Sequence, residues 1–394
     1  MTPEGWTETR FGNAFAKRAE RGKAGLPTMS VTINDGLVFR DSIDRKMDTN
    51  LLAEEHLLVR KGDIAYNMMR MWQGASGLAE ADALVSPAYV VLRPTAAIDP
   101  LFAAYLFKHP RTIYLFWAYS HGLTEDRLRL YFDDFSLIPI CLPPISEQRK
   151  IAEILSVWDR SIETVEALVQ NARNQKQALM QSLLTGKKRL PGFSGEWKTI
   201  RLRDIGRCYN GVTYSPDDIV DESGLLVLRS SNVQRGRLAF LDNVYVNPLI
   251  KFSCLTMEGD ILICVRNGSR NLIGKTARIG TDAVGYAHGA FMSLFRSTDP
   301  EFAYHLFQSD TYEQQVKLNL GATINSINTS DLHKFKFLLP PKAERDRIAA
   351  LLNDADGELK ILETQLAHLH QEKSALMQQL LTGKRRVKIG GDFA

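Results

Sequence analysis

The chain has 394 residues, 44% of them hydrophobic and 24% charged, and carries a formal net charge of +4 at pH 7. This length exceeds what one hydrophobic core can serve, so we expect two to three domains of an ordinary globular protein. No apolar run approaches the roughly 18 residues of a membrane span, and the first ten residues hold no secretion leader. The four cysteines form no C-x-x-C pair, and we expect reduced thiols in a cytoplasmic protein.

Residues 1–141 are predicted to form a domain of mixed α and β structure. Residues 89–92 are rich in β-branched and aromatic side chains and indicate a strand. Residues 100–108 begin with a proline and indicate a helix.

Residues 142–190 are predicted to form a long amphipathic helix after the words Leu142-Pro143-Pro144. Ser146 and Glu147 suit a helix start, and Gly186 followed by basic residues suits its end. A helix over 147–185 would be about 58 Å long. Its polar stretch 171–177 should be solvated. The positions assigned to a coiled-coil core are Ile151, Leu155, Trp158, Ile162, Leu179 and Leu183.

Residues 191–338 are predicted to form a second mixed domain, with strands at 225–228 and 260–265 and a helix at 300–309. Residues 339–394 then contain a second long helix and a tail. The coiled-coil core positions assigned to this helix are Ile348, Leu352, Leu359, Leu362, Leu376 and Leu380.

The two helical segments are copies of each other. Residues 142–190 align with 339–387 without a gap, 197 positions apart, and 20 of the 49 paired positions are identical. The flanking domains share landmarks, because Gly62-Asp63-Ile64 recurs at residues 259–261 and Phe102 recurs as Phe302. A repeat of this kind predicts an α+β molecule with pseudo-two-fold symmetry: two domains separated by two antiparallel coiled-coil helices.

The sequence motifs of this chain resemble those of the specificity subunit of type I restriction–modification systems over essentially the whole chain. The resemblance rests on residues 142–148, on Lys187-Lys188-Arg189 with residues 190–193, and on Gly195-Glu196-Trp197. In the first domain it rests on residues 62–64, 69–74 and 86–89.

The resemblance implies a DNA-reading protein without a catalytic centre of its own. Each domain would read one half of a split, asymmetric site in double-stranded DNA, while the helices set the spacing. The implied partners are two methyltransferase (M) subunits docked on the helices, and restriction (R) subunits. S-adenosylmethionine, ATP and Mg²⁺ would bind those partners and not this chain.

Side chains that read base edges in the major groove are mainly Arg, Asn and Gln, usually offered from loops or helix starts. For any single candidate, a solvated charge or a turn former is the alternative. The first-domain candidates are Arg18, Arg21, Lys23, Asn67, Arg70, Trp72 and Gln73. The second-domain candidates are Tyr209, Asn210, Arg229, Ser230, Asn232, Arg235, Arg266, Asn267, Arg270 and Asn271.

Two other classes of protein stay open from the sequence. One is a self-contained nuclease or methyltransferase with a diverged active site, which would act on DNA without partners. The other is a scaffold that binds proteins, which would lack salt-sensitive, sequence-dependent DNA binding. Gly274-Lys275-Thr276 resembles the end of a phosphate-binding loop, but Ser269 stands where that motif needs glycine and a strand or turn is expected to follow. We therefore expect neither catalytic nor metal-binding residues in this chain.

Overall fold

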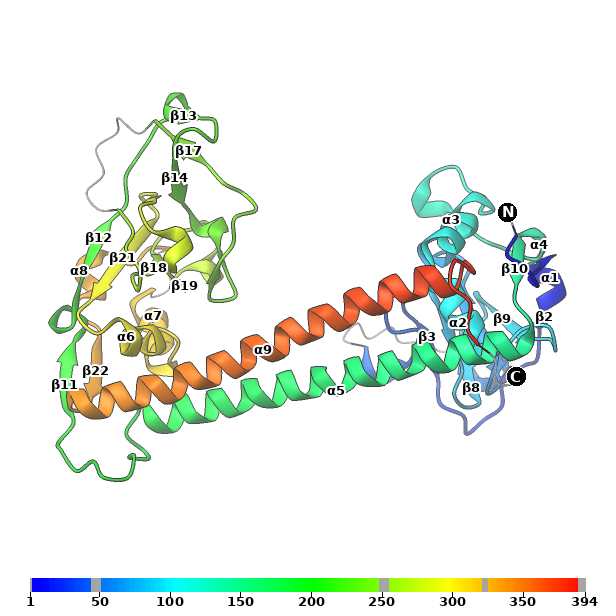
Figure 1. Ribbon diagram of the computed structural model, residues 1–394, viewed down its shortest axis with the longest axis horizontal. Coiled ribbons are helices and arrows are strands. Elements are labelled where there is room, and N and C mark those ends of the chain that lie inside the picture. Colours follow the sequence, from blue (N-terminus) through cyan, green and yellow to red (C-terminus); the bar gives the residue numbers. More distant parts are fainter. Residues whose placement is uncertain (1, 44–50, 248–254, 321–324, 389–394) are drawn as a thin grey trace. The chain divides into compact units, whose positions relative to one another are not determined.

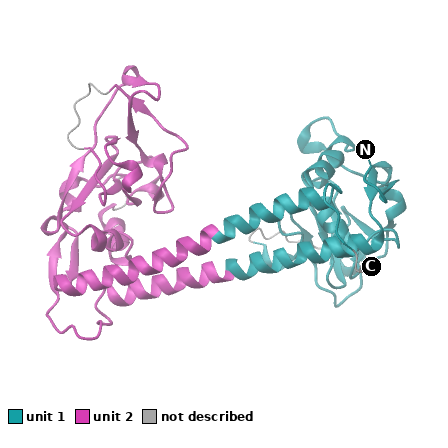
Figure 2. Ribbon diagram, in the orientation of Figure 1, with its two compact units in different colours: residues 1–166, 365–394 teal, residues 167–364 magenta. Residues whose placement is uncertain are grey.

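The computed structural model describes residues 2–43, 51–247, 255–320 and 325–388, which fall into two compact units. Unit 1 comprises residues 1–166 and 365–394, and unit 2 comprises residues 167–364, as Figure 2 shows. Each unit therefore contains one globular domain with parts of both long helices. Of the cysteines, Cys141, Cys208 and Cys264 are free thiols, and Cys254 lies outside the described residues.

The domain of unit 1 is built on a four-stranded antiparallel sheet in the order β2-β9-β6-β7. Figure 1 labels two of these strands, β2 and β9. Its helices are α1 (Phe11–Ala14), α2 (Pro100–Lys108), α3 (Pro110–Ala118) and α4 (Phe132–Leu137). Its strands are β1 (Thr7–Arg10), β2 (Phe15–Arg18), β3 (Met29–Val31), β4 (Leu37–Phe39), β5 (Leu57–Val59), β6 (Ile64–Asn67), β7 (Ser76–Leu78), β8 (Ala83–Val85), β9 (Tyr89–Pro94) and β10 (Pro139–Leu142).

The domain of unit 2 repeats this plan with a four-stranded sheet in the order β12-β21-β18-β19. Its helices are α6 (Pro300–Leu306), α7 (Asp310–Leu320) and α8 (Thr329–Leu332). Its strands are β11 (Lys198–Arg201), β12 (Gly206–Asn210), β13 (Ile219–Val220), β14 (Leu225–Leu228), β15 (Val233–Gln234), β16 (Arg237–Leu238), β17 (Tyr245–Val246), β18 (Ile261–Cys264), β19 (Thr276–Arg278), β20 (Ala287–His288), β21 (Met292–Ser297) and β22 (Lys336–Leu339). The same domain contains a second four-stranded sheet in the order β13-β17-β14-β20.

The register confirms that the two sheets are copies. Ile64 of β6 pairs with Leu92 of β9, and its counterpart Ile261 of β18 pairs with Phe295 of β21. Helix α2 coincides with the predicted helix at 100–108, because the Asp99 carboxylate caps its first turn and Pro100 occupies its first position. Helix α6 ends at Leu306, three residues before the predicted end of its helix.

The predicted long helices are α5 (Ile145–Leu183) and α9 (Lys342–Leu380), each of 39 residues. In both units a segment of α5 packs antiparallel against a segment of α9. Three kinds of pair between the two repeated segments, residues 142–190 and 339–387, each occur twice, once per unit, at positions related by the 197-residue repeat; the arginines of the first kind follow the ends of α9 and α5. The pairs are Glu147–Arg386 with Glu344–Arg189, Asp159–Lys373 with Asp356–Lys176, and Glu166–His370 with Glu363–Arg173.

Most of the predicted coiled-coil positions are buried, but they do not form one uniform seam. Ile151, Leu155 and Leu380 belong to the core of unit 1, and Leu183, Ile348 and Leu352 belong to that of unit 2. The ends of the helices are therefore covered by the domains as well as by each other. Of the remaining positions, Ile162 and Leu359 are buried, whereas Trp158, Leu362 and Leu376 are half-buried.

Two predictions about the helix faces are wrong. Leu179 is 38% exposed, and its neighbour Met180, at 8% exposure, takes the core position. The buried positions of this stretch run Val169, Ala172, Lys176 and Met180, so the 3.6-residue period places Leu179 beside the stripe. Lys176 lies in the stretch predicted to be solvated, yet it is buried and its Nζ lies 2.6 Å from Asp356 Oδ1.

Candidate nucleic-acid interface

Seven of the predicted DNA-contacting residues lie in two equivalent loops. The β6–β7 loop, residues 68–75, carries Arg70, Trp72 and Gln73, and it follows Asn67 at the end of β6. The β18–β19 loop, residues 265–275, carries the candidates Arg266, Asn267, Arg270 and Asn271. The second loop is three residues longer, whereas strands β6 and β18 are both four residues long and β7 and β19 are both three. The two sheets thus have strands of equal length, and they differ in the loops that carry the candidate side chains.

The β6–β7 loop of unit 1 is ordered by its own polar groups. The Met69 amide donates to Asn67 Oδ1 at 3.0 Å, and the Trp72 indole donates to the Met69 carbonyl at 3.1 Å. The Arg70 guanidinium is exposed and donates to Gln73 Oε1 at 3.1 Å. These bonds hold an Arg and a Gln side by side, a combination suited to adjacent guanine and adenine edges.

The β18–β19 loop of unit 2 contacts a second candidate segment. Asn267 Nδ2 donates to Ser230 Oγ at 3.0 Å, and Ser230 begins the short helix η7 (Ser230–Asn232). The Arg266 guanidinium lies 5.8 Å from the centre of the Phe291 ring. A hollow of about 420 Å³ adjoins them, lined by Ser230, Phe291 and Arg229 among others. Arg229 is already paired with Asp242 at 2.8 Å.

Phe291 is a member of this surface that the sequence did not point to. Its side chain is 54% exposed and packs under a guanidinium, which is an arrangement suited to a cation–π contact or to stacking on a base. A lone phenylalanine three residues after His288 carries no local signal of exposure, because most phenylalanines are buried.

Two predicted DNA contacts are engaged by partners inside their own domain. Arg18 is bound bidentately by Asp63, at 2.5 and 3.1 Å, and this carboxylate precedes β6, at the other end of the strand from the β6–β7 loop. Asn232 is 0% exposed, and its amide bonds the Ala239 carbonyl and the Arg229 amide. Both side chains stabilise the fold, because the buried Asp63 carboxylate and the buried Asn232 amide must find their partners inside the protein.

The candidates Tyr209 and Asn210 precede a glycine, Gly211, that packs against another segment of the domain. The backbone of Gly211 approaches that of Gly289 so closely that a Cβ would lie 1.9 Å from its carbonyl oxygen. The close approach is therefore to the residue that follows β20. Tyr209 lies 5.4 Å under the Arg296 guanidinium, and Asn210 accepts a hydrogen bond from Thr329. Tyr209 is thus partly engaged in packing.

The remaining candidates lie on exposed turns. Arg235 has a φ of 51° at the tip of the β15–β16 hairpin, where Gly236 follows with φ 78°. Such a two-residue turn with positive φ at both positions matches the right-handed twist of its strands. Arg21 and Lys23 are exposed between β2 and β3, and Lys23 Nζ lies 4.0 Å from Glu20.

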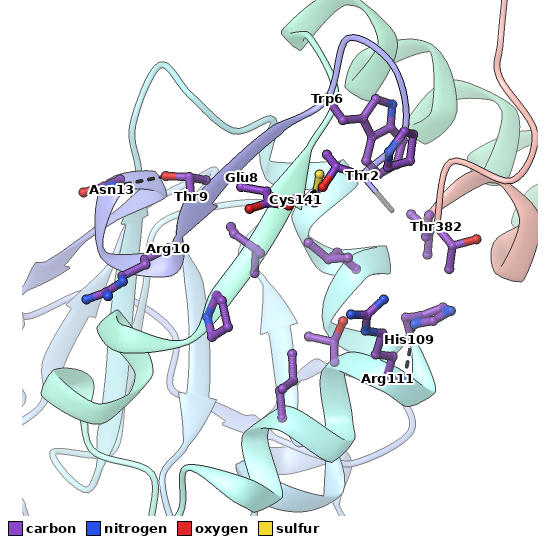
Figure 3. Close-up of a pocket in the computed structure, with 17 residues that line it drawn as sticks. Thr2, Trp6, Glu8, Thr9, Arg10, Asn13, His109, Arg111, Cys141 and Thr382 are labelled. Carbon is purple, nitrogen blue, oxygen red and sulfur yellow. Dashed lines mark hydrogen bonds between the residues drawn. The ribbon is translucent and has the colours of Figure 1, made fainter.

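Unit 1 also contains a hollow of about 790 Å³ that none of the DNA-contact candidates lines. Figure 3 shows it between β1, the start of α3 and the end of α9, with Arg10, His109 and Arg111 among its polar residues. Burial of the His109 imidazole, together with the nearby Arg111 charge, lowers its pKa. Cys141 also lines the hollow, and burial raises the pKa of its thiol.

The sequence that resembles a phosphate-binding loop does not form one. Gly274 closes the β18–β19 loop and Thr276 begins strand β19, whereas the phosphate-binding motif leads into a helix. Within the described ranges no group of three or more His, Cys, Asp or Glu side chains is placed to hold a metal ion. No helix among the described residues has the length and apolar character to cross a membrane.

Comparison with known proteins identifies a family whose model matches this chain. Residues 12–172 and 194–371 match the family model described as the type I restriction modification DNA specificity domain. The chain is 24% identical to the type I restriction enzyme MjaVIII specificity subunit of Methanocaldococcus jannaschii, over 98% of this chain and 94% of that protein. It is 26% identical to the putative MjaX specificity subunit of the same organism, over 95% and 91% of the two chains. The fold is similar to the crystal structure of the S subunit from M. genitalium, with a TM-score of 0.61 at 16% identity over 96% and 99% of the chains.

Proposed function

This chain belongs to the type I restriction–modification DNA specificity family, and from that premise we propose that each of its two domains reads one half of a bipartite, asymmetric DNA site. The observation that carries the proposal is the pair of equivalent hairpin loops. Two copies of one sheet end in loops that differ in both length and sequence. Two different loops on two copies of the same sheet are suited to binding two different half-sites.

The proposed contacts of the first domain are Asn67, Arg70, Trp72 and Gln73, with Arg21 and Lys23 at exposed positions between β2 and β3. Those of the second domain are Arg266, Asn267, Arg270 and Asn271, together with Ser230, Phe291 and the tip residue Arg235. Arg and Gln or Asn side chains on such loops would read guanine and adenine edges, while the outlying cations would contact phosphates.

The proposed partners follow from the same premise. Two methyltransferase subunits would dock on the α5–α9 pair, and restriction subunits would join them. S-adenosylmethionine, ATP and Mg²⁺ would be held by those subunits, and this chain would contribute no catalytic residue. The complex would act on double-stranded DNA in the cytoplasm.

Methylome sequencing tests the proposal directly. Cells that express the chain with its methyltransferase subunits should carry methylated bases in one split motif, interrupted by a fixed number of unspecified base pairs. Cells that express the methyltransferase subunits alone should lack that methylation. A single uninterrupted motif would contradict two separate readers, and DNA cleavage or methylation by the purified chain without partners would contradict a non-catalytic role.

A further inference from the structure

In each candidate reading loop the second-last residue is a glycine, here its closing glycine, whose carbonyl oxygen accepts a hydrogen bond from a side chain of the adjoining helices. Gly74 closes the β6–β7 loop with φ 83°, and Gly274 closes the β18–β19 loop with φ 84°. The Lys108 ammonium at the end of α2 donates to the Gly74 carbonyl at 2.8 Å. The Tyr312 hydroxyl of α7 donates to the Gly274 carbonyl at 3.0 Å.

The two donors are not counterparts in the repeat. Helices α2 and α3 begin 200 residues before α6 and α7, so the counterpart of Lys108 is Gln308 and that of Tyr312 is Thr112. Gln308 instead accepts a hydrogen bond from Lys176 at 2.8 Å. The two domains therefore hold the same carbonyl with different residue types at different positions. What they share is the bond itself.

The two glycines also pack against a helix of their domain in the same way. A Cβ at Gly74 would lie 3.1 Å from Ile113 Cδ1 of α3, and one at Gly274 would lie 2.6 Å from Val316 Cγ1 of α7. The loop backbone thus rests against the helix, with its φ in the region that favours glycine. A side-chain donor then fixes the orientation of the peptide at this seat.

Each loop is further tied to a neighbouring loop. Lys108 Nζ also donates to the Ile33 carbonyl at 2.8 Å, in the turn between β3 and β4. In the second domain Asn267 provides the tie, through its bond to Ser230. Lys108 is half-buried with these two carbonyls, and burial lowers the pKa of its ammonium group. It is therefore placed inside the domain and away from a DNA phosphate.

We propose that Lys108 and Tyr312 are positioning residues for DNA reading, each fixing the loop of its own domain without contacting DNA. The inference rests on the proposed function of the two loops. Hydrogen bonding to base edges requires side chains placed within fractions of an ångström, so a loop released at its closing glycine should lose discrimination between bases. General attraction to the phosphates should stay the same.

Half-site discrimination tests this inference. The full chain, purified with its methyltransferase subunits, is titrated with a duplex that carries the methylome motif and with two duplexes in which one half or the other is scrambled. The variants are Lys108→Met and Tyr312→Phe, the second of which removes one hydroxyl from an otherwise intact ring. Gln73→Ala and Asn267→Ala mark which half belongs to which loop. Lys317→Met, an exposed lysine of α7, is the matched control.

Lys108→Met should reduce discrimination about tenfold at the half that Gln73→Ala affects, which corresponds to about 1.4 kcal/mol. Tyr312→Phe should do so at the half that Asn267→Ala affects. Each should leave the other half, and the slope of log affinity against log salt, unchanged. Lys108→Arg should recover part of the loss, because its guanidinium can also donate to two carbonyls.

Equal loss at both halves, or unchanged discrimination in both variants, would overturn the positioning role. Failure of the unsubstituted complex to discriminate either half would instead contradict the proposed function. The two failures are therefore distinguishable in one set of titrations.

Discussion

At the scale of single residues, charges that look alike in the sequence have opposite roles in the structure. Arg18 and Arg70 are both arginines near a strand of the first domain, but Arg18 is bound by the buried Asp63 while Arg70 is exposed on a loop. The sequence could nominate both and could not separate them, because a partner 45 residues away decides which side chain remains available. Asn232 shows the same difficulty for a neutral side chain.

The buried carboxylate of Glu344 supports a prediction about stability. It is 0% exposed, accepts two hydrogen bonds from Arg189 at 2.7 and 2.6 Å, and accepts a third from Trp197 at 3.1 Å. Glu344→Gln should lower the free energy of unfolding by about 2 kcal/mol, since charge-assisted hydrogen bonds to a buried group are lost. Calorimetry of the purified chain should show the melting temperature falling by roughly 4–8 °C.

The same substitution should remove an acid-dependent part of the stability. The hydrogen bond from Arg189 holds the pKa of Glu344 below its usual range, so its contribution is complete above the ordinary glutamate pKa and is lost as pH falls through the lowered value. The difference from the parent chain should thus be constant near neutral pH and shrink in acid. Glu358→Gln, at an exposed position of α9, should change neither quantity. An equal effect of both substitutions would contradict the prediction.

At the scale of elements, the sequence defined the long helices well and one stretch of their faces poorly. The helix predicted at 147–185 is α5 at Ile145–Leu183, and the second long helix predicted within 339–394 is α9, because start signals, stop signals and the repeat agree. Leu179 and Met180 are both apolar and adjacent, and both recur as Leu376 and Met377, so composition alone could not choose between them. Which of the two is buried depends on the helical period that runs from the buried Val169 to Met180. Lys176, which was predicted from the sequence to be solvated, is one of the buried positions between them.

A neighbouring pair of substitutions checks this phase. Met180→Ala should destabilise the chain by about 2–5 kcal/mol, because Met180 belongs to the core of unit 2 and its removal leaves a cavity. Leu179→Ala should change the free energy of unfolding by less than about 0.5 kcal/mol, as is usual for surface positions. Denaturant unfolding followed by circular dichroism would measure both. The reverse order of effects would show that the face is wrongly assigned.

At the scale of the whole molecule, the repeat made the architecture predictable while the reading surfaces were predictable only in part. A gapless duplication gives the number, order and class of the elements before any contact is known. The candidate loops were found because polar residues follow strands, and Phe291 and the glycine seats were missed because exposure and close backbone approach are properties of the folded chain. Sheet order could not be read from the strands, since non-local pairing decides it.

Shortening both long helices together tests whether they set the gap between the half-sites. Residues 160–166 face residues 366–372, between the Asp159–Lys373 and Arg173–Glu363 pairs. Removing both segments keeps the apolar stripe in phase and shortens the pair by about 10 Å, or roughly three base pairs. The methylome motif should then have a gap about three base pairs shorter, or be lost. An unchanged gap would contradict the idea that the helices are the ruler.

The control for this experiment keeps the length and changes the surface. Replacing only the exposed side chains of the same two segments with alanine should leave the gap as it was, because the distance along the helices is unaltered. A changed gap in this variant would mean that side chains of these segments, and not their length, determine the spacing.

The duplicated ionic pairs bear on how such a protein can acquire new specificities over generations. Every member of those pairs comes from the two helical copies, and none comes from a globular domain. Genetic exchange of either domain would leave the whole set intact, so a lineage could adopt a foreign reader without rebuilding its frame. Drift at Glu147, Asp159, Lys176 or Arg189, in contrast, would break a bond whichever reader was present. The reading loops can therefore change in sequence while the paired residues of the two repeated segments must be kept.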